Sequence, residues 1–494
     1  MRRKPEKLVK FINAKAFCFA LVLIAILCST SFGQSITWQR IYNGPANQND
    51  RVFSLSPADG NNFYAVGSTV ISGNYHYILK LNEFGDTIWT RIFQFAPPIG
   101  DFSLSSTEDG NGGVVVTGDS DSSFTLRLDK NGNIVWYKSY GMIAATGNTI
   151  IRKNRNGYLV CGRKLGSDYY GYVLNIDSLG EIIWQKLYLS TEFKNYESAV
   201  ELNNGYFLAG DVLDAVIDTQ HVLLSKINYS GDIEWEKRHT VFGRGGNAKK
   251  MLKLDGRLLI AGTTYDSLSG GKGYFLITDT IGNMISTKVF QYPKYERLTD
   301  VIALNNNKLI FTLTRDSTIF LKITRVLIAD TVGNILQEKL FVPPQREGYI
   351  FFESIIKANN GDFIYGGYSE LDTNNSNADV HLARTDSLLY APPIGIPNSS
   401  YEVPMAFVIL PPYPNPFNPS TSIEYRISKT GIVKISLYDI NGKLISIILN
   451  EKKQTGVHLL KIELSKYNLS SGVYFLKFTY NNSINVSSKI ILIK

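Results

Sequence analysis

One hairpin motif returns about every fifty residues along most of this 494-residue chain. A clear copy is LDKNGNIVWYKSY at residues 128–140, which predicts a strand, a short turn and a second strand. Aligned on the turn glycine, the copies are 47, 48, 51, 51, 51 and 56 residues apart. They lie at Gly85, Gly132, Gly180, Gly231, Gly282, Gly333 and a degenerate Leu389. A period of this length indicates a repeat architecture.

Each repeat predicts four short strands. A strand ending in glycine, such as GYLVCG or GYFLAG, is followed by a strand such as GYVLNI, and the hairpin supplies the fourth. Four copies carry Trp four residues after the turn glycine, at Trp89, Trp136, Trp184 and Trp235. Alternating apolar residues, Gly and Asn turns and this period are typical of β-propeller blades. We expect each Trp to pack between neighbouring blades, where a large flat side chain contributes most burial.

The two ends of the repeat region complement each other. The first three strands of the unit occur seven times, and the last copy has no fourth strand. A segment with the fourth-strand pattern, ITWQRIY at residues 36–42, precedes the first copy. The pattern therefore predicts a seven-bladed propeller over residues 34–390, in which the N-terminal strand closes the last blade and removes an open sheet edge.

The first 33 residues differ from the repeats. A basic stretch precedes the apolar run AFCFALVLIAILC at residues 16–28, and STSFGQ offers small residues before a cut between Gly33 and Gln34. This pattern predicts a secretory signal peptide and leaves no transmembrane segment in the mature chain. The mature chain keeps one cysteine, Cys161, which we interpret as a small core residue.

Charge is divided unevenly along the chain. Removing residues 1–33 takes away six basic groups and one acidic group, so the formal charge falls from +8 to +3. Residues 411–494 carry 11 basic and four acidic groups, a net +7, which leaves residues 34–410 at −4. Nucleic acid is therefore not an expected partner of the propeller.

The connections of the predicted blades fall into two sets. Turns such as ADGNN and DKNGN are short, whereas segments such as FQYPKYERLTD and YSELDTNNSNAD are long and unlike one another. We expect a ligand to bind on the long-loop face. The candidate residues are the carboxylates of a possible acidic ring and exposed loop side chains: Asp101, Glu197, Asp300, Glu353, Tyr169, Tyr295 and Arg297. The alternative is that the carboxylates satisfy backbone groups where strands begin.

No catalytic, cofactor-binding or metal-binding residues are predicted. The chain has no phosphate-binding loop, HExxH or GxSxG motif, and its histidines have no metal-ligand spacing. The hairpin resembles the Trp-docking repeats of quinoprotein dehydrogenases and the Asp-box of sialidases, but its turn length and its Trp spacing differ from theirs. The alternative to a binding protein is an extracellular polysaccharide-active hydrolase or lyase, or a quinone-type oxidoreductase, that uses the long-loop face.

The chain changes character after a Pro-rich linker at residues 391–410. Alternating strands over residues 411–494 predict a small antiparallel β-sandwich, so the expected fold class is all-β throughout. This segment resembles the type A C-terminal sorting domain of the type IX secretion system, found in Bacteroidetes and relatives. The motif residues that carry the resemblance are Pro414, Asn415, Pro416, Phe417, Asn418, Pro419, Asp439, Gly442, Gly472 and Tyr474.

The resemblance implies a destination. It implies that the type IX machinery is a partner of the C-terminal domain and that the protein passes through the periplasm. It also implies that the protein is then secreted or displayed on the outer surface of a Gram-negative-type bacterium. The propeller is then expected to be a binding or interaction module for a glycan or a protein.

Overall fold

A computed structural model describes residues 36–392 and 407–493, except residues 47, 72, 96–101, 121, 144, 165–169, 191, 215–218, 242–244, 267–269, 293, 306, 317–320, 344–347, 371–376, 410–416, 428–429, 455, 468 and 482–483. The predicted signal peptide lies outside the described residues. The chain divides into two compact units, with the division between Ile394 and Gly395 and a short segment, Asn43–Asn47, grouped with the second unit. The described residues contain no helix long and apolar enough to cross a membrane.

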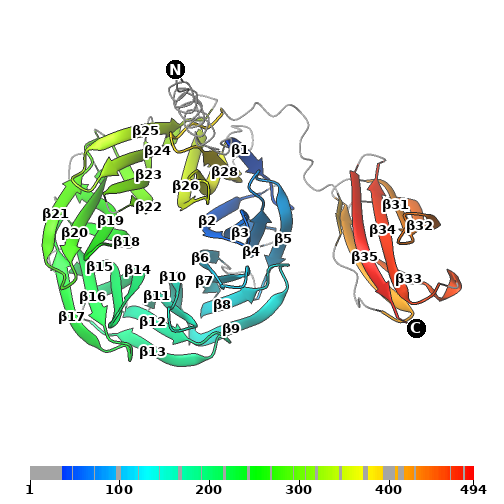
Figure 1. The fold of residues 1–494 in the computed structure, drawn as a ribbon, viewed down its shortest axis with the longest axis horizontal. Coiled ribbons are helices and arrows are strands. Elements are labelled where there is room, and N and C mark those ends of the chain that lie inside the picture. The colour runs from blue at the N-terminus through cyan, green and yellow to red at the C-terminus, as the bar shows by residue number, and fades with distance from the viewer. Residues whose placement is uncertain are drawn as a thin grey trace, which may run out of the picture. The chain divides into compact units, whose positions relative to one another are not determined.

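The first unit is a seven-bladed β-propeller (Figure 1). Within each of the first six blades the strands follow chain order from the centre of the ring outward. The first six blades are β2–β5 (Asp50–Pro57, Phe63–Val70, Asn74–Leu81, Thr87–Phe93), β6–β9 (Phe102–Glu108, Val114–Ser120, Ser122–Leu128, Ile134–Ile143), β10–β13 (Ala145–Arg152, Tyr158–Lys164, Tyr170–Ile176, Ile182–Tyr188), β14–β17 (Phe193–Leu202, Gly205–Asp214, Thr219–Ile227, Ile233–His239), β18–β21 (Gly246–Leu254, Arg257–Asp266, Gly270–Asp279, Met284–Val289) and β22–β25 (Glu296–Asn305, Lys308–Asp316, Leu321–Asp330, Ile335–Phe341).

The seventh blade combines the two ends of the propeller sequence. It contains β26 (Gly348–Lys357), β27 (Phe363–Glu370), β28 (Asp379–Thr385) and, as its outermost strand, β1 (Trp38–Tyr42). β1 pairs antiparallel with β28, so that Trp38 lies opposite Arg384 and Tyr42 opposite Val380. The ring of blades is thereby closed by hydrogen bonds between residues more than 300 positions apart in the chain.

Each innermost strand contains a β-bulge at the same place. In the first blade, for example, Phe53 is inserted between the pairs Val52–Gly67 and Ser54–Val66. The glycine that ends each second-strand motif lies beside this bulge in six blades. A Cβ atom on these glycines would approach the carbonyl oxygen of the inner strand to 1.8–1.9 Å. In these six blades the backbone beside the bulge leaves no room for a side chain, which explains the recurring glycine. The sixth blade has the bulge too, but its backbone accommodates the side chain of Leu313 at this position.

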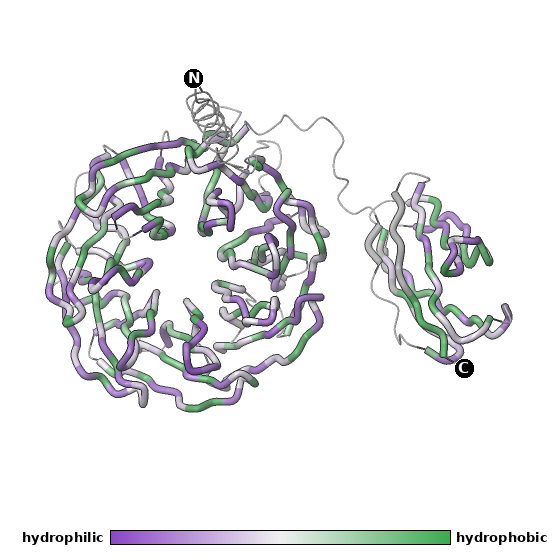
Figure 2. Tube along the Cα trace, in the orientation of Figure 1, coloured by the Kyte–Doolittle hydropathy of each residue, from purple (hydrophilic) through white to green (hydrophobic). Residues whose placement is uncertain are grey.

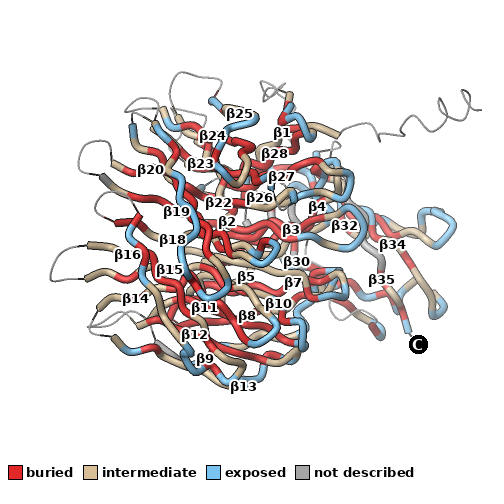
Figure 3. Tube along the Cα trace, turned by 60° about the vertical axis from the view of Figure 1, so that its left-hand side comes forward, coloured by how far each residue is buried: buried red, intermediate tan, exposed pale blue. Residues whose placement is uncertain are grey.

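Burial is greatest along the second and third strands of each blade (Figure 3). Separate apolar clusters fill the spaces between neighbouring blades, and Leu159, Val173 and Leu208 belong to one of them. Cys161 lies in the same cluster, and burial raises the pKa of its thiol. It is therefore a core residue with little thiolate character.

The second unit is a small β-sandwich. One sheet has the order β29 (Phe407–Ile409), β30 (Ser420–Ile427), β33 (Gly456–Glu463). The other has the order β32 (Leu444–Lys453), β31 (Gly431–Tyr438), β34 (Gly472–Tyr480), β35 (Ile484–Leu492), and a short 3-10 turn lies at Ser465–Tyr467. Residues of both sheets share one apolar core. The predicted all-β fold class, a propeller followed by an antiparallel sandwich, is confirmed.

Candidate binding site at the channel mouth

The two faces of the propeller differ in how they are built. The turns between first and second strands and between third and fourth strands lie on one face, which we call the turn face. The other connections lie on the opposite face, the loop face. In the hairpin turn of the second blade, the Asp129 carboxylate accepts hydrogen bonds from the amides of Asn131 and Asn133, both at 2.8 Å. Such turns recur in every blade and fix the shape of the turn face.

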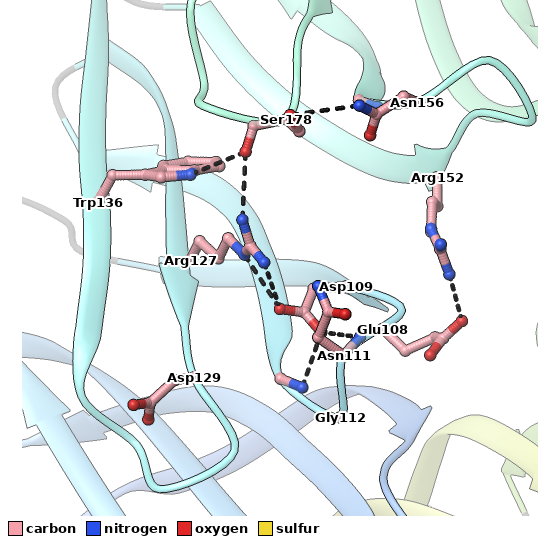
Figure 4. A network of polar contacts seen from close by, with 12 residues as sticks. Glu108, Asp109, Asn111, Gly112, Arg127, Asp129, Trp136, Arg152, Asn156 and Ser178 are labelled. Atoms are coloured by element: carbon pink, nitrogen blue, oxygen red, sulfur yellow. Dashed lines mark hydrogen bonds and ion pairs between the residues drawn. The ribbon is translucent and has the colours of Figure 1, made fainter.

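A Trp at this position joins five of the seven blades to the next, and the fifth and sixth blades carry Ser286 and Gln337 there. In the second blade, Trp136 Nε1 donates to the carbonyl oxygen of Ser178, in the hairpin turn of the third blade, at 3.1 Å (Figure 4). Arg127 donates to the same oxygen at 3.3 Å and pairs with Asp109 at 2.9 Å. The predicted position of Trp between blades is confirmed, and we call this arrangement the latch.

The latch also closes the propeller. Trp38 of β1 donates to the Glu83 carbonyl oxygen at 3.1 Å, and Arg384 of β28 donates to the same oxygen at 2.8 Å. Arg384 is fully buried and pairs with buried Asp362 at 3.0 Å. The hydroxyl of Tyr42 adds a hydrogen bond of 2.6 Å to the Gly85 carbonyl oxygen.

A basic residue two positions after the Trp position completes the latch. It extends toward the hairpin turn of the next blade, as Lys138 does to Glu181 at 2.6 Å and Lys186 to Asp232 at 2.5 Å. The seven residues at this position are Arg40, Arg91, Lys138, Lys186, Lys237, Lys288 and Lys339. The turn face is thus made of similar contacts between similar residues, which is expected of a scaffold.

Toward the loop face, the innermost strands carry unlike residues at equivalent positions. We call two sets of positions the mouth ring: the bulge residue of each innermost strand and the residue two positions before it. Apart from the buried Thr146 and Thr299, all are partly exposed. From the first blade to the seventh, the bulge residues are Phe53, Leu104, Asn148, Glu197, Lys249, Thr299 and Glu353, and their partners are Arg51, Phe102, Thr146, Asn195, Asn247, Arg297 and Phe351.

One side of the mouth ring is aromatic and comprises blades seven, one and two. The ring of Tyr368, on β27, lies 5.2 Å from that of Phe351 and 6.4 Å from that of Phe53, between ring centroids. Tyr349 lies 5.0 Å from Phe351, and the Arg51 guanidinium lies 4.8 Å above the Tyr368 ring. This aromatic arc brings side chains from two neighbouring blades into one partly exposed group.

The opposite side, from blade three to blade five, is rich in amides. Asn148 Nδ2 contacts Asn195 Oδ1 at 2.8 Å and Glu197 Oε1 at 3.2 Å, across the boundary between two blades. Asn195 Nδ2 also donates to Glu197 at 2.8 Å, and Lys249 Nζ lies 3.6 Å from the other oxygen of that carboxylate. This amide arc is held in place by its own hydrogen bonds before any ligand arrives. Hydrophilic and hydrophobic residues both occur on the innermost strands (Figure 2).

Asp211 lies directly behind the amide arc, on the second strand of the fourth blade. Burial raises its pKa to about 6, although hydrogen bonds from Gln220 and Asn195 oppose the rise. Gln220 donates at 2.8 Å and Asn195 at 3.3 Å. The carboxyl group therefore titrates near neutral pH beside the candidate site.

The structure brings together some of the predicted site residues. Glu197, Glu353 and Arg297 belong to the mouth ring, and Arg297 pairs with Glu353 at 2.6 Å. Tyr295 is partly buried against Gly270 and Gly271 at the loop-face end of its blade. Asp101 and Tyr169 lie outside the described residues.

One residue that the sequence analysis placed on the binding face is buried. Asp300 accepts hydrogen bonds from the amides of Val301 at 2.8 Å and Ile355 at 3.0 Å, so it satisfies backbone groups of two blades, as the alternative interpretation predicts. The described carboxylates thus occupy different levels of the inner strands and do not form one acidic ring.

Sequence reasoning missed the amides and aromatics of the mouth ring. Asn148, Asn195, Phe53 and Phe351 carry no motif of their own. A usable signal was present, because the recurring second-strand glycine marks the bulge in the strand before it and so identifies the bulge residue of the mouth ring.

Other candidate sites are weaker. The described residues contain no group of three or more His, Cys, Asp and Glu side chains suited to a metal ion. His381 is fully buried, and burial lowers its pKa to about 3. Its imidazole is therefore neutral and packs in the core. A pocket of about 60 Å³ on the turn face, lined by Asn61, Asn359 and Arg384 among others, is much smaller than typical ligand pockets.

The C-terminal motif residues have structural roles in the sandwich. Phe417 is buried and exchanges backbone hydrogen bonds with Ile491 and Ile493 at 3.0 and 2.9 Å, which ties the start of the domain to its end. Asp439 caps the turn that contains Gly442, and the Tyr474 hydroxyl donates to the Ser470 carbonyl oxygen at 2.8 Å. Gly472 begins β34, and Asn418 and Pro419 precede β30. Pro414, Asn415 and Pro416 lie outside the described residues.

Comparison with known proteins identifies the C-terminal segment. Residues 412–494 match the family described as the secretion system C-terminal sorting domain. No curated protein matches the chain. A solved structure that is similar is described as "Crystal structure of a protein of unknown function from Bacteroides caccae at 1.35 A resolution", with 15% identity and a TM-score of 0.34, over 48% of this chain and 81% of that one. The sorting-domain match confirms the predicted resemblance and supports export through the type IX system to the outside or the surface of a Bacteroidetes-type bacterium.

Proposed function

We propose that this chain, carried out of the cell by the sorting domain at residues 412–494, is a binding protein that holds an extracellular ligand at the mouth ring of its propeller. In this proposal residues 1–33 are a signal peptide cut before Gln34, residues 34–390 form the binding propeller and residues 391–410 form the linker. The propeller carries out no reaction of its own.

One observation carries this proposal. The mouth ring places unlike side chains at equivalent positions of seven repeats, whereas the latch keeps nearly the same residues at its equivalent positions. Packing demands are similar in every blade, so packing alone would favour similar residues in the ring. The ring also combines partly exposed aromatics, amides and Arg side chains, which are the residue types that supply binding energy and orientation in recognition sites.

A thermal-shift screen of the secreted mature protein tests the proposal. A ligand that binds only the folded state raises the melting temperature, and the screen includes soluble glycans, peptides, calcium, cell-wall fragments and quinones. The shift should be lost in the double variant Phe53→Ala with Glu197→Ala and kept in Phe84→Ala, a control on the turn face whose side chain is 50% exposed. A shift that survives in the ring variant would contradict the proposed site, and turnover of a bound polysaccharide would contradict a binding role without chemistry.

Export is tested separately. Deleting residues 411–494 should keep the protein out of the culture medium and the outer surface, while the propeller accumulates inside the cell envelope. Appearance of the truncated chain in the medium at the full-length level would show that the C-terminal domain is not required for export.

A further inference from the structure

We propose that the ligand of the mouth ring is a neutral oligosaccharide, stacked on the aromatic arc and hydrogen-bonded by the amide arc. This inference rests on the proposed function, because it takes the mouth ring as the binding site and adds the chemical class of the ligand. Three properties of the ring support it: its shape, its charge and the opposition of its two arcs.

The position of the ring within the fold favours a slender ligand. The bulge residues lie inside strands rather than in loops; Glu197, for example, is within β14 (Phe193–Leu202) and Glu353 is within β26 (Gly348–Lys357). A ligand that contacts these residues must reach the innermost strands of several blades, which a linear chain of small units can do.

The charge of the ring favours a neutral ligand. The ring holds three cations, Arg51, Lys249 and Arg297, and two anions, Glu197 and Glu353. Behind the ring, Asp211 has the guanidinium of Arg163 in its surroundings, so these two groups add no net charge. Most of the ring charges also have partners, since Arg297 pairs with Glu353 at 2.6 Å and Lys249 lies 3.6 Å from Glu197. A site with an excess of one charge offers little steering field for a polyanion or a polycation.

The two arcs match the two kinds of surface on a sugar ring. The carbon–hydrogen face of a pyranose is apolar, and the partly exposed group of Phe53, Phe351 and Tyr368 offers aromatic surface for it. Each sugar hydroxyl both donates and accepts, and so does each side-chain amide. Asn148, Asn195 and Asn247 present amides from three adjacent blades, and the first two are fixed by the contacts with Glu197. A chain crossing the channel would meet both arcs.

An oligosaccharide array probed with the mature full-length protein tests the inference. The array carries neutral plant, fungal and bacterial oligosaccharides, acidic polysaccharide fragments and unrelated peptides, and calorimetry measures the affinity of each hit. We expect a neutral oligosaccharide to bind. Phe351→Ala and Asn195→Ala should each weaken binding about tenfold, and Phe84→Ala on the turn face should not. Phe351→Leu and Asn195→Asp serve as milder variants, and an unchanged melting temperature shows that each variant is folded.

The outcomes separate the inference from the proposed function. Binding of a peptide or an acidic glycan that the ring variants weaken would keep the ring as the site and overturn the neutral-oligosaccharide assignment. Binding of any ligand that no ring variant weakens would overturn the ring as the site, and with it the proposed function. Failure of every neutral oligosaccharide to bind would overturn the inference.

Discussion

The turn face and the mouth ring of the propeller come from the same seven repeats. The turn face uses similar residues at equivalent positions, whereas the mouth ring uses different ones. On the turn face, neighbouring blades are joined by the same Trp, basic residue and capped turn, as at Trp136, Lys138 and Asp177. In the mouth ring, equivalent positions hold residues as different as Phe53, Asn148 and Lys249. The difference teaches that repeated residues hold the ring of blades together, whereas the positions without repetition are those at which we propose that the ligand binds.

Two carboxyl groups, one from each region, differ in their neighbours. Behind the turn face, the buried carboxylate of Asp362 is paired with the buried guanidinium of Arg384. Behind the mouth ring, the carboxyl group of Asp211 has amide neighbours, and burial raises its pKa. Removing one partner of a buried ion pair leaves an uncompensated buried charge, whereas a carboxyl group with amide neighbours can change its protonation state with pH.

The largest expected effect comes from breaking the closing latch. Arg384→Met should lower the free energy of unfolding by about 3–5 kcal/mol, because it leaves Asp362 buried without its partner. Urea denaturation of the propeller, followed by tryptophan fluorescence, measures the change. The control is Arg152→Met, which removes the exposed Arg152–Glu108 pair and should cost less than about 1 kcal/mol. Equal effects of the two variants would show that the buried pair does not close the propeller.

The next effect concerns pH and the mouth ring. Between pH 4 and 6 the folded protein binds a proton at Asp211 that the unfolded chain releases, because the pKa is about 6 in the folded protein and its ordinary value is 3.8. Stability from this group is therefore present at low pH and is lost as pH rises to 6, by about 2–3 kcal/mol.

Asp211→Asn should remove this dependence and should stabilise the protein at pH 7. The melting temperatures of both proteins are measured across pH 4–8. Burial lowers the pKa of His381, so that residue makes stability rise with pH, opposite to the effect of Asp211. The difference between the two proteins cancels the contribution of His381 and leaves that of Asp211. A difference in melting temperature that does not vary with pH would contradict a raised pKa at Asp211.

A smaller effect is expected at the glycine that accommodates the bulge. In Gly162→Ala the new Cβ would lie 1.9 Å from the Thr146 carbonyl oxygen, so the inner strand must shift, at a cost of roughly 1–3 kcal/mol. Gly60→Ala is the comparison, because nothing lies within 4 Å of its Cβ position and only the strain of φ +67° remains. Chemical denaturation ranks the two, and a smaller cost for Gly162→Ala would argue against the close approach.

The smallest effect should come from an exposed latch contact. Lys138→Ala removes the Lys138–Glu181 pair at 2.6 Å, which is largely exposed, and should change the free energy of unfolding by less than about 1 kcal/mol. The change should shrink further as salt is raised. A large, salt-independent loss would mean that the basic residues of the latch contribute more than solvent-exposed ion pairs do.

The sequence by itself determined the repeat, the number of blades and the sorting domain. The period, the turn glycines and the Trp spacing are local patterns that recur from repeat to repeat. A repeat that departs from the pattern can therefore still be recognised by comparison with the others. The motifs of residues 411–494 were sufficient to identify the sorting domain, because several of them occur in the expected order.

Only the tertiary structure decided which residues meet at the channel. Asp300 and Glu353 looked alike in the sequence, yet a difference of one position relative to the bulge buries one against the backbone and leaves the other in the mouth ring. Asn148 and Asn195 lie in different blades, and Phe53 and Phe351 are almost 300 residues apart. The β-bulges and the closure of the ring decide which of these residues lie close together. Both are backbone features, so the identities of the side chains concerned do not reveal them in the sequence.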